Sequence, residues 1–113
     1  MQDLGSQFLL RESDIGQRRD ESSLRRLQEL NYYVHVDTLA SALKIDTLDL
    51  LRAYNVVVLT DSRLALANTV NHFCRSHGIK FIWTGLLGVF GYVFVDFGAS
   101  FEVFDKDGLL FSL

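Results

Sequence analysis

The chain contains no proline, a single cysteine and no long uninterrupted apolar run, and each absence narrows what it can be. Without proline, turns must rely on glycine, asparagine and aspartate. Cys74 alone excludes an intramolecular disulfide framework and a cysteine-based metal cluster, which suits a reducing compartment. The most apolar stretch, 79–97, is interrupted by Lys80, Asp96 and three glycines, so we expect no membrane-spanning segment.

The charge balance is nearly even and argues against a nucleic-acid partner. The net charge is -3, and no basic surplus of the kind that binds phosphate backbones is present. The residues after Met1 lack the charged and apolar regions of a signal peptide. With 113 residues, 49% of them hydrophobic, the chain suits one small core-forming domain. We therefore expect no nucleic-acid and no membrane partner.

Hydrophobic periodicity predicts a helix in the first third of the chain. It should begin at Asp14 or Gly16 and end near Asn31, with acidic residues in its first turn. Three leucines fall on one side at helical spacing: Leu24, Leu27 and Leu30. Residues 32–36 are rich in β-formers and predict a strand.

The middle of the chain predicts a strand–helix–strand unit. A short helix from Asp46 or Thr47, with Leu48 and Leu51 on one face, should precede it. Residues 56–59 are apolar without alternation, which is typical of a parallel strand buried on both faces. The next helix should be capped by Asp61 or Ser62, end at Gly78 and lead into a strand over 79–83.

The last third of the chain predicts antiparallel strands. A glycine-rich loop over 85–91 should lead to a strand at 92–97, then to a last strand at 101–104 and a turn at 105–108. The predicted fold class is therefore α/β, with a mostly parallel sheet and a C-terminal antiparallel strand pair.

Six sequence segments, in order, resemble those of one enzyme family. They are Gln7-Phe8 with Asp14-Ile15-Gly16, Leu27–Asn31, Val56–Thr60, Phe73–Phe81, Gly88–Gly91 and Phe94–Gly98. Together they resemble the inactive adenylation half of ubiquitin-activating enzymes, with a partial Rossmann-like (ThiF-type) fold. The resemblance implies that 1–113 is a single partial domain lacking its first glycine-rich βαβ unit. It also implies that 99–113 begins the following domain.

The family resemblance also implies a function and partners. Enzymes of this family adenylate the C-terminus of a ubiquitin-like protein with ATP and Mg, and form a thioester on a cysteine in another domain. Two homologous halves pair, and only one is competent. The expected partner is thus the active adenylation half, with ubiquitin or a ubiquitin-like protein reached through the parent enzyme. ATP and Mg would bind to the parent enzyme, and we expect no cofactor in this chain. The expected location is the cytoplasm or the nucleus.

Departures from the family pattern predict that this chain is not catalytic. Gly5 and Ser6 stand where the family has the phosphate-handling Asn and Arg, and Arg19 stands where it has a Lys. Gly85 and Leu87 replace an Asp and an Arg, and no GxGxxG turn is present. We therefore expect no catalytic residue in this chain.

The resemblance leaves vestigial nucleotide-side positions, each with a structural alternative. They are Gln7, Arg11, Arg19 and Asp61. For the arginines, together with Arg18, the alternative is a solvated basic face, because anion sites rely on backbone N–H groups. For Asp14 and Asp61 the alternative is a helix cap.

Neither the cysteine nor the histidines indicate a reactive or metal site. Cys74 lies on the apolar side of a predicted helix, where a buried thiol is inert. The histidines His35, His72 and His77 lack ligand spacing, so we expect no metal. The C-terminal aromatic residues should lie mostly in the core, with a fraction exposed for a partner.

Two other functions compete with the inactive half. The chain could be a free-standing truncated interaction or decoy module that binds an activating enzyme without chemistry. It could also be an adenylating enzyme of the sulfur-carrier type, although such enzymes normally show zinc-binding cysteine pairs and the glycine-rich turn that this sequence lacks.

Overall fold

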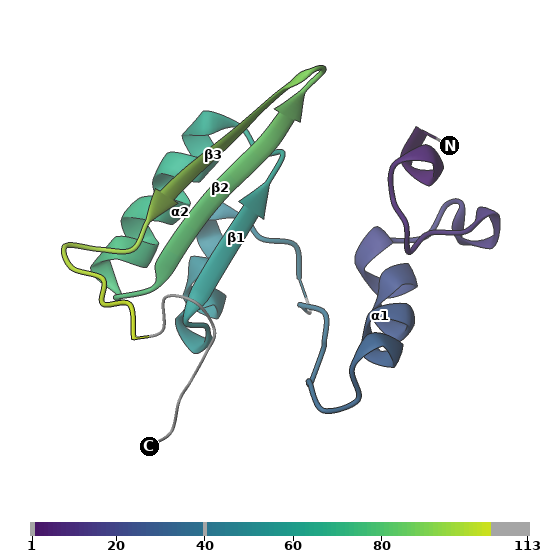
Figure 1. Ribbon diagram of the computed structural model, residues 1–113, viewed down its shortest axis with the longest axis horizontal. Helices are drawn as coiled ribbons and strands as arrows, with labels where there is room; N and C mark the ends of the chain where they lie inside the picture. The colour runs from purple at the N-terminus through teal and green to yellow at the C-terminus, as the bar shows by residue number, and fades with distance from the viewer. Residues whose placement is uncertain (1, 40, 105–113) are drawn as a thin grey trace. The chain divides into compact units, whose positions relative to one another are not determined.

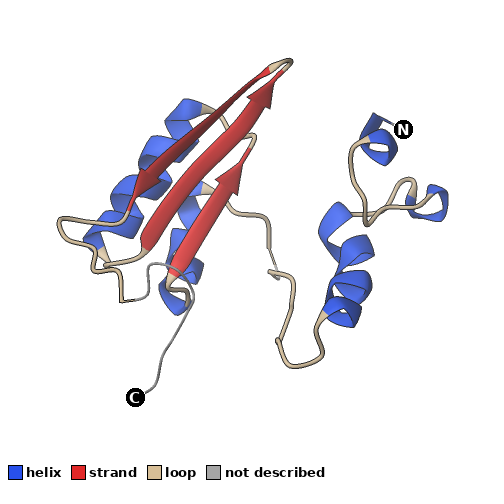
Figure 2. Ribbon diagram, viewed as in Figure 1, coloured by secondary structure: helices blue, strands red, loops and turns tan. Residues whose placement is uncertain are grey.

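The computed structural model describes residues 2–39 and 41–104, which fall into two compact units divided after Ala42 (Figure 1). The first unit carries short helical turns and one helix. The second carries a three-stranded sheet and its helices (Figure 2). None of the described helices combines the length and apolar character needed to cross a bilayer.

The first unit contains two 3-10 turns, η1 (Gln2–Gly5) and η2 (Glu12–Asp14), and the helix α1 (Arg19–Leu30). The predicted helix is confirmed, but its predicted start at Asp14 or Gly16 is wrong. Gly16 has a φ of 87° and Arg18 is still extended, so helical geometry begins only at Arg19.

The predicted strand over 32–36 is wrong, because this segment forms a turn. The backbone N–H of Val34 donates to the carbonyl of Asn31 at 3.2 Å, and that of Tyr33 donates to the Asn31 side chain at 3.0 Å. A β-forming sequence needs a neighbouring strand to pair with. The residues described between 2 and 39 supply none.

The second unit follows the predicted strand–helix–strand order. Its elements are η3 (Ile45–Ala53), β1 (Val56–Thr60), α2 (Leu64–Ser76), β2 (Lys80–Leu87) and β3 (Phe90–Asp96). The sheet order is β1-β2-β3, with β1 parallel to β2 and β2 antiparallel to β3. The α/β class and the antiparallel pair at its C-terminal side are confirmed.

The boundaries of the antiparallel pair differ from those predicted. Residues 85–91 do not form a loop. The ladder continues to Leu87 opposite Phe90, and Gly88 with φ of 64° makes the tight turn between them. The predicted strand over 101–104 is wrong, because these residues are irregular. The predicted turn at 105–108 lies outside the described residues.

The core of the second unit lies between α2, η3 and one face of the sheet. Its buried side chains are Leu48, Leu51, Val57, Ala67, Val70, Cys74, Ile79 and Phe81. The prediction that β1 is buried on both faces is wrong. Val57 is buried, whereas Val56 and Val58 on the opposite face are at least half exposed, since the second unit covers only one face with helices.

The ends of α2 were only half predictable. At its C-terminus the N–H of Ile79 donates to the carbonyl of Cys74 at 2.9 Å, and Gly78 has a φ of 70°. This is the Schellman geometry that the glycine predicted. At its N-terminus the cap residue is Arg63, so the predicted caps Asp61 and Ser62 are wrong.

Candidate functional site

A small pocket in the first unit brings together two of the predicted nucleotide-side residues, Arg11 and Arg19. Its other lining residues are Leu4, Leu10, Asp14, Ile15, Gly16 and Gln17. Its volume is about 90 Å³. Pockets for small molecules usually have about 300–1,000 Å³. The pocket therefore has room for a small ion or a few waters, but not for a nucleotide.

The one carboxylate in this pocket is already paired within the protein. Asp14 accepts a hydrogen bond from the guanidinium of Arg26 at 2.6 Å and another from the backbone N–H of Arg11 at 2.9 Å. The Arg26 hydrogen bond is the main reason why the pKa of Asp14 lies below its ordinary value. Asp14 is thus a link between η2 and α1 rather than a cap of α1.

Arg26 is the residue that sequence reasoning missed in this unit. Besides Asp14 it donates to the carbonyl of Leu9, so it holds two segments that precede α1. The sequence pattern does not distinguish Arg26 from its neighbour Arg25, which makes only a surface pair with Glu29. The pairing joins residues twelve apart through an irregular segment, which periodicity does not reveal.

Gln7 and Asp61 do not contribute to this pocket. Gln7 is exposed, and its carbonyl accepts from the N–H of Leu10 at 3.1 Å. Asp61 belongs to the second unit, where its φ of 49° is a left-handed conformation that aspartate tolerates better than most residues. Its N–H donates to the carbonyl of Thr84 at 2.9 Å, and its carboxylate accepts from the N–H of Leu86 at 3.3 Å. Asp61 thereby fastens the end of β1 to β2.

Gly85 has a packing role. A Cβ at this position would lie 2.5 Å from the hydroxyl and 2.7 Å from Cζ of Tyr92, the residue opposite it in β3. The Tyr92 ring also meets Trp83 edge-on, with ring centroids 4.7 Å apart. The absence of a side chain at position 85 therefore makes room for an aromatic pair on the sheet.

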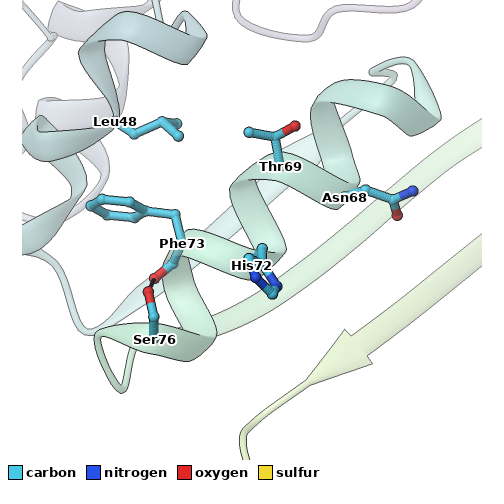
Figure 3. A pocket seen from close by; sticks show the side chains of 6 residues that line it. All are labelled: Leu48, Asn68, Thr69, His72, Phe73 and Ser76. Carbon is cyan, nitrogen blue, oxygen red and sulfur yellow. Dashed lines mark hydrogen bonds between the residues drawn. The ribbon is translucent and has the colours of Figure 1, made fainter.

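A wider groove lies along α2 beside η3 (Figure 3). Its lining residues are Leu48, Asn68, Thr69, His72, Phe73 and Ser76, and its volume is about 600 Å³. Ser76 donates to the carbonyl of Phe73 at 2.8 Å, as drawn in Figure 3. Among the residues that the structure describes, no carboxylate and no lysine or arginine lines the groove. Its polar groups, which include the imidazole of His72, suit hydrogen bonding to a ligand or partner.

Cys74 and His77 lie in different environments. Cys74 is fully buried, as its helical position predicted, and burial raises the pKa of its thiol. His77 instead stacks on Phe73 at the end of α2, with ring centroids 4.2 Å apart. The described residues contain no group of three or more His, Cys, Asp or Glu placed to hold a metal ion.

ATP with Mg does not fit the residues that the first unit brings together. The pocket is too small for the nucleotide, and the carboxylate that lines it is held by Arg26. Asp61, the other acidic candidate, already accepts a hydrogen bond from the backbone N–H of Leu86 in β2.

The parallel β1–α2–β2 unit with its antiparallel third strand defines a partial Rossmann-like fold of the ThiF type. The ThiF family model matches residues 1–107, so the chain belongs to the ThiF family.

The chain is also similar to ubiquitin-activating enzymes, as the sequence motifs predicted. The chain is 45% identical over 106 residues to ubiquitin-like modifier-activating enzyme 1 of Mus musculus, covering 94% of this chain and 10% of that protein. It is 44% identical over 112 residues to ubiquitin-like modifier-activating enzyme 6 of Homo sapiens, covering 94% and 11%. It is 42% identical over 108 residues to ubiquitin-activating enzyme E1 2 of Arabidopsis thaliana, covering 94% and 10%. The chain thus spans about a tenth of the length of these relatives.

Proposed function

We propose that the chain serves as the non-catalytic adenylation half of a ubiquitin-like modifier-activating enzyme and pairs there with the active half. The observation that carries this proposal is the presence of the uncharged residues Gly5 and Ser6 where the family resemblance implies phosphate-handling side chains, and the small pocket lined by Arg11 and Arg19 is in keeping with it. ATP, Mg and the ubiquitin-like protein would be bound by the active half. The expected location is the cytoplasm or the nucleus.

Three replacements support the loss of chemistry. Gly5 and Ser6 carry no charge at positions where the family resemblance implies phosphate-handling side chains. At Gly85, where the resemblance implies an aspartate, the space is taken by the Tyr92 ring. A carboxylate could return there only if Tyr92 moved, so the packing of the sheet supports a structural role at this position.

The chain would act through contact with another protein rather than through chemistry of its own. The second unit is a helix-covered sheet with one face still exposed, and exposed apolar surface of this kind marks protein contact sites. In the proposed complex this chain moves no proton and forms no covalent intermediate. It holds its own sheet in shape and presents it to the active half.

ATP–pyrophosphate exchange tests the proposal. The chain alone, with ubiquitin and Mg-ATP, should exchange no label above background. An active half expressed without its own inactive half should gain exchange activity when this chain is added. Substituting both Arg11 and Arg19 by alanine should leave that gain unchanged. Ubiquitin-dependent exchange by this chain alone would overturn the proposal.

The same assay separates the decoy module from the inactive half. A decoy would lower the exchange rate when added to a complete activating enzyme and would restore none to an isolated active half.

A further inference from the structure

The carboxylate of Asp96, the last residue of β3, accepts hydrogen bonds from two different parts of the second unit. Arg75 in α2 donates through Nη1 to both oxygens, at 2.7 and 2.9 Å, and Asn71 in α2 donates to Oδ2 at 3.2 Å. The backbone N–H of Gly98, in the turn that follows β3, donates to Oδ1 at 3.0 Å. The Asp96 side chain is only 11% exposed, and a charged group so nearly buried is stable only when it is paired. One carboxylate therefore joins α2 to this turn.

The positions of these groups follow from the helix and the sheet. Asn71 and Arg75 are four residues apart in α2, so their side chains lie on the same face of the helix. Asp96 lies opposite Phe81 in the register, and Phe81 is part of the buried core, so both side chains are on the face of the sheet that α2 covers. Arg75 also belongs to the last turn of α2, where the helix dipole favours a cation. Two regular elements thus hold the donors and the acceptor in place.

The turn after β3 is built on the hydrogen bond of Gly98. A side-chain oxygen that accepts from the N–H two residues further on forms an Asx turn, which mimics a backbone turn. Gly98 has a φ of 93°, in the left-handed region that glycine adopts most readily. The residues described beyond it are irregular, and the rings of Phe97 and Phe101 contact each other with centroids 4.7 Å apart. The path of residues 97–104 away from the sheet thus begins at the Asp96 carboxylate.

An Asx turn by itself leaves the carboxylate free to rotate. An aspartate side chain has two torsion angles, and rotation about either one carries Oδ1 away from the N–H of Gly98. Arg75 opposes that rotation, because its guanidinium contacts both oxygens and a charge-assisted hydrogen bond is roughly twice as strong as a neutral one. Asn71 adds a neutral donor to Oδ2. The two residues of α2 therefore fix the rotamer on which the turn depends.

We propose that Asp96 is a conformational lock, and that Arg75 and Asn71 are positioning residues for the turn at Gly98, on which they act through the carboxylate. With the lock closed, residues 97–104 leave the sheet in one direction. When Arg75 is removed, the carboxylate rotates more freely, the turn opens, and the segment samples other directions while β2 and β3 remain paired. All of these contacts lie within the second unit, so the lock operates whether or not the chain pairs with an active half.

Amide exchange measured by NMR on the whole chain at neutral pH tests the lock. Arg75→Gln should speed the exchange of the Gly98 amide by about tenfold or more, because the hydrogen bonds lost are those of a charged donor. The amides of Trp83 and Phe94, which lie opposite each other in the middle of the β2–β3 ladder, should exchange as before. A change confined to Gly98 would show that Arg75 controls the turn without stabilising the sheet.

Matched variants separate the lock from general effects of charge. Arg75→Lys keeps a charged donor and should restore most of the protection, whereas Asn71→Ala removes only the neutral donor and should have a smaller effect than Arg75→Gln. Arg52→Gln is the control, since it removes an arginine of the same unit that pairs with Asp49 rather than with Asp96. Combining Arg75→Gln with Asp96→Asn should open the turn no further than Asp96→Asn alone, because Arg75 acts through that carboxylate.

Four results would overturn the proposal. The first is an unchanged exchange rate of Gly98 in Arg75→Gln, since the turn would then be purely local. The second is an equal acceleration in Arg52→Gln, and the third is a combined variant in which the effects of Arg75→Gln and Asp96→Asn simply add. The fourth is acceleration of Trp83 and Phe94 by the same factor as Gly98, because the whole unit and not the turn would then have opened.

Discussion

Each of the two units of this chain is stabilised internally by a different kind of interaction. The buried apolar core found among the described residues comes wholly from 43–104, whereas no residue of α1 is buried. In the first unit Leu27 and Leu30 are exposed, and Arg26 provides links to Asp14 and Leu9. Burial of apolar surface contributes about 25 cal/mol per Å², while a hydrogen bond to a charged group contributes about 1.5–3 kcal/mol. The second unit is therefore stabilised by its own apolar core, whereas the first depends on a few polar contacts.

The largest effect should come from the centre of the second unit. Phe81→Ala removes a fully buried ring and should lower the free energy of unfolding by about 3–5 kcal/mol. The free energy of unfolding of a small domain is about 5–15 kcal/mol in total, so much of the fold's stability would be lost. Phe94→Ala, at a ring that is 47% exposed on the adjacent strand, should cost about 1 kcal/mol or less. Urea unfolding measures both; equal losses would show that the core is misplaced.

The next effect concerns the aromatic pair on the sheet. Gly85→Ala should destabilise the second unit by about 1–3 kcal/mol, because the added methyl group meets the ring of Tyr92. Gly91→Ala is the matched control. Its methyl group would meet the flexible end of Leu86 at 3.2 Å and should cost less. Combining Gly85→Ala with Tyr92→Ala should remove the clash, and a double-mutant cycle without coupling would contradict it.

A smaller effect should appear in the pH dependence of the second unit. Asp96 accepts from the N–H of Gly98, from Arg75 and from Asn71, and these bonds lower the pKa of its carboxyl, the Gly98 bond foremost. A depressed pKa stabilises the fold above the ordinary value of 3.8, and this stability is lost as the pH falls through the lower folded pKa.

Asp96→Asn should therefore flatten the decline of unfolding free energy below pH 3.8. Asp49→Asn is the control, since Asp49 makes only an exposed pair with Arg52. Denaturant unfolding between pH 2 and 6, about the range over which carboxyl groups titrate, measures the slope. An unchanged slope in Asp96→Asn would contradict the role given to this carboxylate.

The smallest effect on global stability should come from the first unit. Arg26→Gln breaks the bond to Asp14, yet it should leave the urea midpoint of the second unit unchanged. Limited proteolysis should instead cut the segment before α1 faster. Arg25→Gln, which removes only a surface pair with Glu29, should change neither. A shifted midpoint in Arg26→Gln would show that the two units are coupled.

The sequence predicted the second unit well, because its signals are local. The β-branched run in β1, the helical spacing of Val70 and Cys74 and the terminal Gly78 each depend on neighbours within a few residues. Sequence patterns gave wrong predictions where strand pairing determines the secondary structure. Residues 32–36 have β propensity but no described strand beside them, and 85–87 extend β2 because β3 lies opposite.

The candidate site was predictable only in part. Family resemblance identified Arg11 and Arg19, and the structure places both around one pocket. It could not show that Asp14 is held by Arg26, or that the Tyr92 ring takes the space beside Gly85, because these contacts join residues apart in the chain. Asp61 was expected to cap α2, but its carboxylate reaches β2 instead.

The measurement that tests the central claim most directly is binding of this chain to a purified active adenylation half that lacks its own inactive half. We predict a one-to-one complex in size-exclusion chromatography with light scattering, together with a gain of ubiquitin-dependent ATP–pyrophosphate exchange by that complex. No complex at any concentration, or exchange by this chain without the active half, would contradict the account.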